Sequence, residues 1–220
     1  MEFLSTSFAL GAGSFVPPSE ILIDTGLLAT LPSDELASGV GEILHFLVYA
    51  GEGEFGFLEK RIETVRTDQG QMRALIERSL MIKRSVIEVD ELDMGRRQLF
   101  NYGHSFGHAI EAATNYAIPH GVAVSFGIDI ANYLSVALGL AESAFRDRVR
   151  RVAEPLWEGF SIKGLDVQAV FKALKRDKKN VGSDVYVILT SGFGGCMKVR
   201  IDLEGREGSL IREYFVSEAV

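Results

Sequence analysis

Apolar residues recur at the spacing of an amphipathic helix through most of this sequence. Each such segment keeps its hydrophobic positions three or four residues apart, as a helix with one buried face does. The first begins at Ser33, an N-cap residue that follows Pro32, and Gly51–Gly56 interrupts the pattern after it. The chain is therefore expected to be mainly α-helical. The pattern predicts helices over residues 33–50, 57–66, 71–90, 96–116, 121–138, 142–159 and 166–175, with Pro155 bending or ending the one over 142–159.

Strand patterns are few and short. Val185–Leu189 and Met197–Ile201 are apolar or alternating runs with glycines between them, which predicts a β-hairpin or two short strands. Ile21–Ile23 also fits a short strand, after a small, polar, Gly-rich stretch over residues 1–19 that predicts a loop. The last apolar residues, at 210–215, fit either a short helix or a strand.

The composition indicates an acidic chain with enough apolar residues for a core. Of its 220 residues 47% are hydrophobic, which suffices for one domain, and a net charge of −7 argues against a nucleic-acid surface. Cys196 is the only cysteine, which excludes an internal disulfide and indicates a reducing compartment; we interpret it as a small apolar residue near a strand. With no signal-peptide pattern and no long apolar span, we expect a cytoplasmic protein without a membrane partner.

Three of the four histidines fall between residues 104 and 120. His104 and His108 are four residues apart, so on a helix they share one face, and a loop at His120 can bring a third imidazole to the same place. Catalytic zinc takes three ligands from His, Asp and Glu and leaves one position open. Two or three of these histidines plus a carboxylate would form such a site, although a pair at this spacing is more often structural. Ser105 stands where the zinc-hydrolase motif HExxH has its Glu, which argues against a metalloprotease.

Two further patterns point to a site. Arg97, Asn101, His104 and His108 are spaced four, three and four residues apart and form one polar stripe on the helix predicted over 96–116. A cation, an amide and two imidazoles suit a phosphorylated, hydroxyl-rich substrate. Glu42 lies in an otherwise apolar segment, where a carboxylate is costly unless it is paired or bound to a cation.

The run Asn-Tyr-Gly-His-Ser-Phe-Gly-His-Ala-Ile-Glu at 101–111, followed by His120-Gly121, closely resembles the 3-dehydroquinate synthases, members of the wider sugar-phosphate cyclases. Other segments that resemble this family follow in the same order over most of the chain: Ile21–Thr25, Leu31–Glu42, Lys83, Asp90-Glu91, Gly95, Arg97 and Asp177–Asn180.

The resemblance implies the helical C-terminal domain of the dehydroquinate synthase-like fold, with a small β-hairpin and one remnant Rossmann strand. Residues 1–30 would be a remnant of the nucleotide-binding domain and a linker, with the strand at 21–23 as its last strand. Residues 31–220 would be the metal- and substrate-binding domain. Gly11-Ala12-Gly13 lacks the third glycine and the preceding strand of a dinucleotide-binding loop, so we interpret it as a flexible linker.

The resemblance also implies roles for individual residues. The ligands of a divalent metal, zinc or cobalt, would be Glu42, His104 and His120. Catalytic roles are implied for Lys83, Asn101 and His108. Substrate binding is implied for His45, Arg97, Lys178 and Lys179.

The chemistry implied is that of the shikimate pathway of aromatic amino acid biosynthesis. A 3-dehydroquinate synthase is a lyase that converts a seven-carbon sugar-acid phosphate into a carbocycle. Bound NAD transiently oxidises a hydroxyl, phosphate is eliminated, the ketone is reduced, and an aldol step closes the ring, with the metal as Lewis acid. Because most of the NAD-binding domain is absent, we expect the isolated chain to be inactive, and to act as a homodimer or with a separate NAD-binding partner.

The sequence departs from the family at two positions. Relatives usually carry Lys at the position of His45, and His-Gly-Glu where this chain has His120-Gly121-Val122. A lost ammonium beside a bound acid group would alter substrate choice, so another sugar-phosphate cyclase, acting on a heptulose phosphate in secondary metabolism, is an alternative. A non-catalytic metal-binding remnant is a second one. His45 is itself open between an extra site residue and a helix-face histidine.

Overall fold

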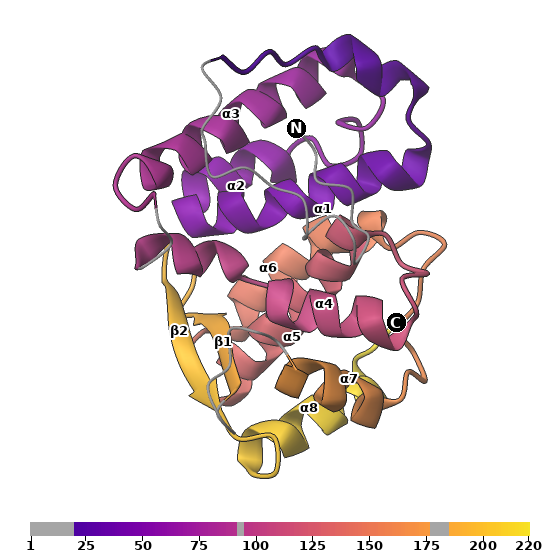
Figure 1. Ribbon diagram of the computed structural model, residues 1–220, viewed down its shortest axis with the longest axis vertical. Helices are drawn as coiled ribbons and strands as arrows, with labels where there is room; N and C mark the ends of the chain where they lie inside the picture. The colour runs from indigo at the N-terminus through magenta and orange to yellow at the C-terminus, as the bar shows by residue number, and fades with distance from the viewer. Residues whose placement is uncertain (1–19, 92–94, 177–184) are drawn as a thin grey trace. The chain divides into compact units, whose positions relative to one another are not determined.

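The computed structural model describes residues 20–91, 95–176 and 185–220 (Figure 1). Contacts divide the chain into two units, Met1–Leu31 and Pro32–Val220. In the described part of the first unit, one 3-10 helix, η2 (Thr25–Thr30), begins at Asp24, whose carboxylate accepts a hydrogen bond from the Gly26 N–H at 2.9 Å. The strand expected at 21–23 is wrong, because no strand is assigned there. A strand needs a neighbouring backbone to pair with, and the two described strands pair only with each other.

The second unit is mainly α-helical with one β-hairpin, which confirms the expected fold class. Its helices are α1 (Ser33–Ala50), α2 (Glu52–Glu59), α3 (Gln69–Ile87), η3 (Arg96–Asn101), α4 (His104–Ala113), α5 (His120–Ala137), α6 (Ser143–Ala153), η4 (Glu154–Leu156), α7 (Val167–Arg176) and α8 (Arg206–Ser217). The strands β1 (Val185–Thr190) and β2 (Cys196–Ile201) pair antiparallel, from Val185 with Ile201 to Thr190 with Cys196. The open assignment at 210–215 is a helix, α8.

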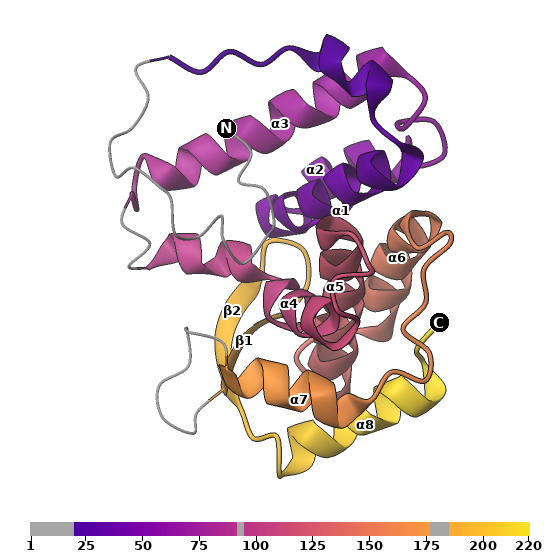
Figure 2. The ribbon, with the colours of Figure 1, turned by 45° about the vertical axis from the view of Figure 1, so that its right-hand side comes forward.

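Helix α5 is the centre of this unit. It contacts α1, α4, α6, α8 and β1, and Figure 2 shows it between α4 and α6. Its residues from Gly121 to Asn132 are all buried. A helix that is buried on every side is a core helix in a globular protein. In the described ranges no helix is long and apolar enough to cross a membrane.

The helix predicted over 96–116 is wrong, because it is two elements. The 3-10 helix η3 ends at Asn101, and α4 begins at His104 after Gly103, whose φ is +81°. A Cβ on Gly103 would lie 2.6 Å from Ile128 Cγ1 and 2.8 Å from the Val124 carbonyl oxygen, both on α5. The break therefore comes from backbone packing against α5, and the predicted polar stripe is divided between two elements.

Other boundaries can also be compared with the prediction. Ser33 is the first residue of α1 rather than its cap, which is Pro32. The break expected over Gly51–Gly56 is limited to Gly51, whose φ is +119°. Helix α2 follows at once, because Phe55 and Leu58 on one of its faces are fully buried. The stretch at 60–67 forms turns instead of continuing a helix. Helix α6 ends at Ala153 in agreement with the expected effect of Pro155, which removes a backbone donor and limits the continuation to η4.

A buried charge cluster joins α5, α6 and α8. The Asp129 side chain, 1% exposed, accepts hydrogen bonds from Arg146 at 3.0 and 3.2 Å, from Arg150 at 2.8 Å and from the Tyr214 hydroxyl at 2.8 Å. Arg146 also pairs with Glu218 at 3.0 Å. Two guanidinium groups thus surround a carboxylate that has almost no contact with water.

Candidate metal centre

The candidate site lies where the first residues of α4 and α5 meet the middle of α1. His104 and His120 are the first residues of their helices, and Glu42 projects toward both. The Oε2 atom of Glu42 lies 3.3 Å from His104 Nε2 and 3.4 Å from His120 Nε2. The structure therefore brings together the three residues predicted to hold a metal.

Each of the two imidazoles is oriented by a second contact at its other nitrogen. His104 Nδ1 lies 3.3 Å from the Tyr102 carbonyl oxygen, and His120 Nδ1 lies 3.1 Å from Glu111 Oε2. Both partners are acceptors, so each Nδ1 carries a proton and each Nε2 faces Glu42. This pattern is typical of metal-ligating histidines, whose second nitrogen donates to a carboxylate or carbonyl.

The distances in this cluster fit a divalent cation. Glu42 Oε2 is buried and has no hydrogen-bond partner among the described residues, although two imidazole nitrogens lie near it. Ligands that bind zinc tetrahedrally at about 2.0–2.1 Å are about 3.3–3.4 Å from one another. The observed separations of 3.3 and 3.4 Å agree with that spacing. Two imidazoles and one carboxylate are also a ligand set that zinc and cobalt accept.

The electrostatics of the cluster follow from its burial. Burial raises the pKa of Glu42, but the imidazoles of His104, His120 and His45 lower it more, so the net pKa is well below its ordinary value. Burial lowers the pKa of His120, but Glu111 and Glu42 raise it more, to about 10. Without a metal the cluster therefore holds an ionised carboxylate and a protonated His120, and a bound cation must displace that proton.

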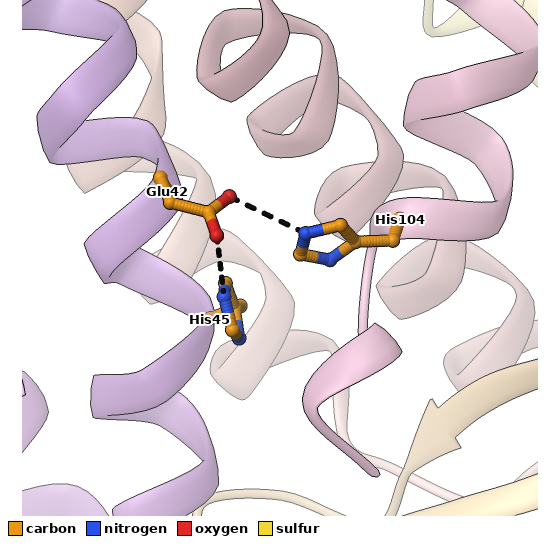
Figure 3. A group of neighbouring side chains, drawn as sticks. All are labelled: Glu42, His45 and His104. Carbon is orange, nitrogen blue, oxygen red and sulfur yellow. Dashed lines mark hydrogen bonds and ion pairs between the residues drawn. The ribbon is translucent and has the colours of Figure 1, made fainter. Parts of the chain in front are cut away.

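His45 is the fourth histidine of this region. It is 1% exposed, and its Nε2 lies 3.4 Å from Glu42 Oε1 (Figure 3). Burial lowers its pKa to about 4, so its imidazole is neutral. The sequence left open whether this is a site residue or a helix-face histidine; the structure shows it buried and in contact with Glu42.

The other predicted site residues lie at varying distances from this cluster. His108 is exposed on α4, with its ring centroid 5.6 Å from that of His104 and 5.5 Å from that of His120. Lys83 is exposed on α3, with Nζ 6.0 Å from the centre of the Phe46 ring.

Arg97 and Asn101 lie on η3 and bond locally. The Arg97 guanidinium donates to the Glu91 carbonyl oxygen at 2.6 Å, and the Asn101 amide donates to the Gln98 carbonyl oxygen at 2.9 Å. Lys178 and Lys179 lie outside the described residues.

Glu111 had no predicted role, although it belongs to the motif at 101–111. It is buried, and it forms a possible metal-binding group with His108 and His120, whose ligand atoms lie within 4.8 Å of one another; Glu42, His45 and His104 form another. Its spacing of seven residues from His104, two helical turns, places it on the same face of α4. In the sequence, that spacing was the available indication that Glu111 lies near the site.

Comparisons with known proteins identify the family to which this chain is similar. Residues 39–180 match the family model described as 3-dehydroquinate synthase C-terminal. The 3-dehydroquinate synthase of Arthrobacter sp. (strain FB24) is 35% identical over 182 residues, 82% of this chain and 50% of the relative. That of Sulfurovum sp. (strain NBC37-1) is 36% identical over 186 residues, 83% of this chain and 52% of the relative. The chain thus spans about half the length of the curated relatives that it matches.

Solved structures share the fold. A 2-deoxy-scyllo-inosose synthase superposes with a TM-score of 0.78 at 22% identity, over 95% of this chain and 57% of the other. The 2-epi-5-epi-valiolone synthase from Streptomyces hygroscopicus subsp. jinggangensis 5008, with NAD⁺ and Zn²⁺ bound, superposes with a TM-score of 0.77 at 24% identity, over 92% of this chain and 56% of the other. A 2-deoxy-scyllo-inosose synthase complexed with carbaglucose-6-phosphate, NAD⁺ and Co²⁺ gives a TM-score of 0.76 at 22% identity, over 90% of this chain and 56% of the other.

Proposed function

Because this chain belongs to the 3-dehydroquinate synthase family, we propose that it forms the metal- and substrate-binding part of a dehydroquinate synthase-like cyclase. The reaction is carbocycle formation from a seven-carbon sugar phosphate with elimination of phosphate. The single observation that carries the proposal is the approach of two oriented imidazoles to one buried carboxylate oxygen, at 3.3 and 3.4 Å.

In this proposal Glu42, His104 and His120 hold a divalent metal. When bound, the metal supplies Lewis-acid polarisation of a substrate oxygen. The names of the structural neighbours, which include Zn²⁺ or Co²⁺ together with NAD⁺, support zinc or cobalt and NAD as cofactors. NAD would be held by a nucleotide-binding domain, which the described helices and hairpin of residues 32–220 do not form.

The remaining side chains act on the substrate. His108 is exposed beside His104 and His120, so it is positioned to transfer a proton at a substrate oxygen or carbon. Lys83, Arg97 and Asn101 would bind charged and hydroxyl groups, together with Lys178 and Lys179. The proposal includes a cytoplasmic enzyme of aromatic amino acid biosynthesis that works as a homodimer or with an NAD-binding partner.

A second candidate is another sugar-phosphate cyclase, acting on a heptulose phosphate. The observation that favours it is the pair of departures at His45 and Val122. Both side chains are buried, with exposures of 1% and 0%, at the two positions where the sequence departs from the family resemblance. Loss of a cation near the metal site reduces the recognition of a substrate carboxylate.

The test has a metal step and an activity step. We expect near-stoichiometric zinc or cobalt on the purified chain by elemental mass spectrometry, retained in His108→Ala and lost in a His104→Ala, His120→Ala double variant. Absence of metal from the wild-type chain after supplementation would overturn the proposal.

Phosphate release is then measured with NAD and a supplied NAD-binding domain, on a 2-keto sugar-acid phosphate and on a heptulose phosphate. The faster substrate decides between the two cyclases. We expect no turnover by the chain alone. If metal binds but the assembled system turns over neither substrate, the chain is the non-catalytic remnant.

A further inference from the structure

The two oxygens of the Glu42 carboxylate have different surroundings. Oε1 lies 3.4 Å from His45 Nε2 in a hydrogen bond, and because a carboxylate oxygen only accepts, Nε2 is the donor. Oε2 faces His104 Nε2 and His120 Nε2 at similar distances but has no hydrogen-bond partner among the described residues. Similar separations thus correspond to two kinds of contact, a hydrogen bond at Oε1 and convergence of potential ligands at Oε2.

The second ring nitrogen separates His45 from the two proposed ligands. His104 and His120 each have an acceptor at Nδ1, the Tyr102 carbonyl and the Glu111 carboxylate. His45 Nδ1 is buried and has no hydrogen-bond partner in the described part of the chain. If His45 bound a metal through Nε2, its proton would move to Nδ1 and a buried donor would lack an acceptor, which is unfavourable. If Nε2 carries the proton, no donor is left unsatisfied.

Packing holds the His45 ring in this orientation. Its centroid lies 3.8 Å from that of Phe46 and 6.1 Å from that of Phe100. The His104 ring meets it edge to face, with centroids 4.8 Å apart and an interplanar angle of 86°. Figure 3 shows the Glu42 carboxylate extending between His45 on its own helix and His104 on α4. A ring that is 1% exposed and surrounded in this way is not accessible to a substrate in solvent.

We propose that His45 is a positioning residue for Glu42: its Nε2–H holds Oε1 and directs Oε2 toward the metal held with His104 and His120. This inference rests on the proposed function, because it assumes that Glu42 is a metal ligand. It differs from the expectation that His45 binds substrate. It also gives the proposed ligand Glu42 a hydrogen-bond donor from its own helix.

The test measures zinc affinity of the full chain by competition with a chromophoric chelator. His45→Leu removes the donor, His45→Gln keeps a side-chain N–H, and His104→Ala removes a ligand. Loss of an outer-shell partner weakens metal binding about 10- to 100-fold. We therefore expect His45→Leu to bind one zinc with a Kd raised by that factor, His45→Gln to lie between it and the wild type, and His104→Ala to lose zinc. Circular dichroism checks folding, and His45→Met serves as the donor-free variant if His45→Leu does not fold.

The visible absorption of bound Co²⁺ separates positioning from direct ligation. If His45 is a positioning residue, the Co²⁺ bands of the donor-free variant keep their wild-type intensity and shift only slightly. A change in coordination number like that of a ligand variant would make His45 a ligand and overturn the inference. Unchanged zinc affinity in the donor-free variant would overturn it alone, with the proposed function intact. A wild-type chain that binds no metal would overturn both.

Discussion

Gly41 and Gly121 hold α1 and α5 in direct backbone contact: a Cβ on Gly41 would lie 2.2 Å from the Gly121 carbonyl oxygen. Each of these glycines is adjacent in sequence to a proposed ligand, Glu42 or His120. The same relation recurs at Gly103, which precedes His104 and packs on α5. Close approach of the backbones thus brings three side chains from three helices to one point.

Gly121→Ala should both destabilise the chain and disrupt the metal centre. The added Cβ would lie 1.8 Å from the Ser38 carbonyl oxygen and 2.8 Å from the Glu42 backbone nitrogen, so α1 and α5 must move apart. Overpacking of this kind costs about 1–3 kcal/mol, and contact with backbone atoms places this case at the upper end. Urea unfolding and zinc affinity measure the two effects.

Gly39→Ala is the matched control on α1. This glycine is exposed, and a Cβ there meets nothing within 4 Å. A glycine replaced by alanine within a helix gains about 0.5–1 kcal/mol. If Gly39→Ala and Gly121→Ala change the free energy of unfolding by the same amount, close backbone packing does not explain the need for glycine at position 121.

Asp129→Ala should be strongly destabilising. The substitution leaves the buried faces of Arg146 and Arg150 without their shared carboxylate. Removing one partner of a buried ion pair costs about 3–5 kcal/mol. Glu154→Ala is the comparison, because Glu154 also pairs with Arg150 but is 49% exposed, so its loss should cost at most about 1 kcal/mol. Equal unfolding midpoints for the two variants would contradict a stabilising role for the buried cluster.

The Cys196 thiol should resist alkylation while the chain is folded. Burial raises its pKa from about 9 to about 12, so at pH 8.5 the native thiol is protonated. Iodoacetamide should therefore react much more slowly in buffer than in urea. The linked effect on stability appears only in alkali: the unfolded thiol loses its proton above pH 9 and the native one above pH 12, so stability falls between these values. Similar alkylation rates in buffer and urea would contradict this burial.

The sequence predicted those parts of the fold that depend on local pattern. The extents of α1 and α5 follow from their apolar positions, and the hairpin from two short apolar runs separated by glycines. The break at Gly103 was missed, because a glycine in a helical pattern is usually tolerated, and only contact with Val124 and Ile128 on α5 requires its positive φ.

The site was predicted to the extent that a motif carries it. The family resemblance supplied Glu42, His104 and His120, whose convergence is a tertiary property that spacing does not contain. The orientation of His45 toward Glu42 follows the turn of α1, but the rings of His104 and Phe100 that pack against it come from other elements. Periodicity within α4 placed Glu111 on the same face as His104. It did not reveal the pairing of Glu111 with His120, which is the first residue of another helix, α5.

Glu111 should control metal affinity through His120. Its Oε2 accepts a hydrogen bond from the Nδ1–H of His120, with the two atoms 3.1 Å apart, and so leaves Nε2 as the ligand atom. Glu111→Ala removes that acceptor, and we expect a zinc Kd raised about 10- to 100-fold. Glu111→Gln keeps a neutral acceptor and should recover part of the affinity.

The control for Glu111 is Glu77→Gln, an exposed carboxylate on α3 that pairs only with Arg73 among the described residues, and it should leave zinc affinity unchanged. The comparison also separates orientation from charge. Glu111→Gln and Glu111→Ala remove the same negative charge, so a difference between their affinities measures the hydrogen bond to His120. Equal affinities in these two variants would mean that Glu111 acts through charge, and wild-type affinity in both would mean that His120 needs no partner to bind the metal.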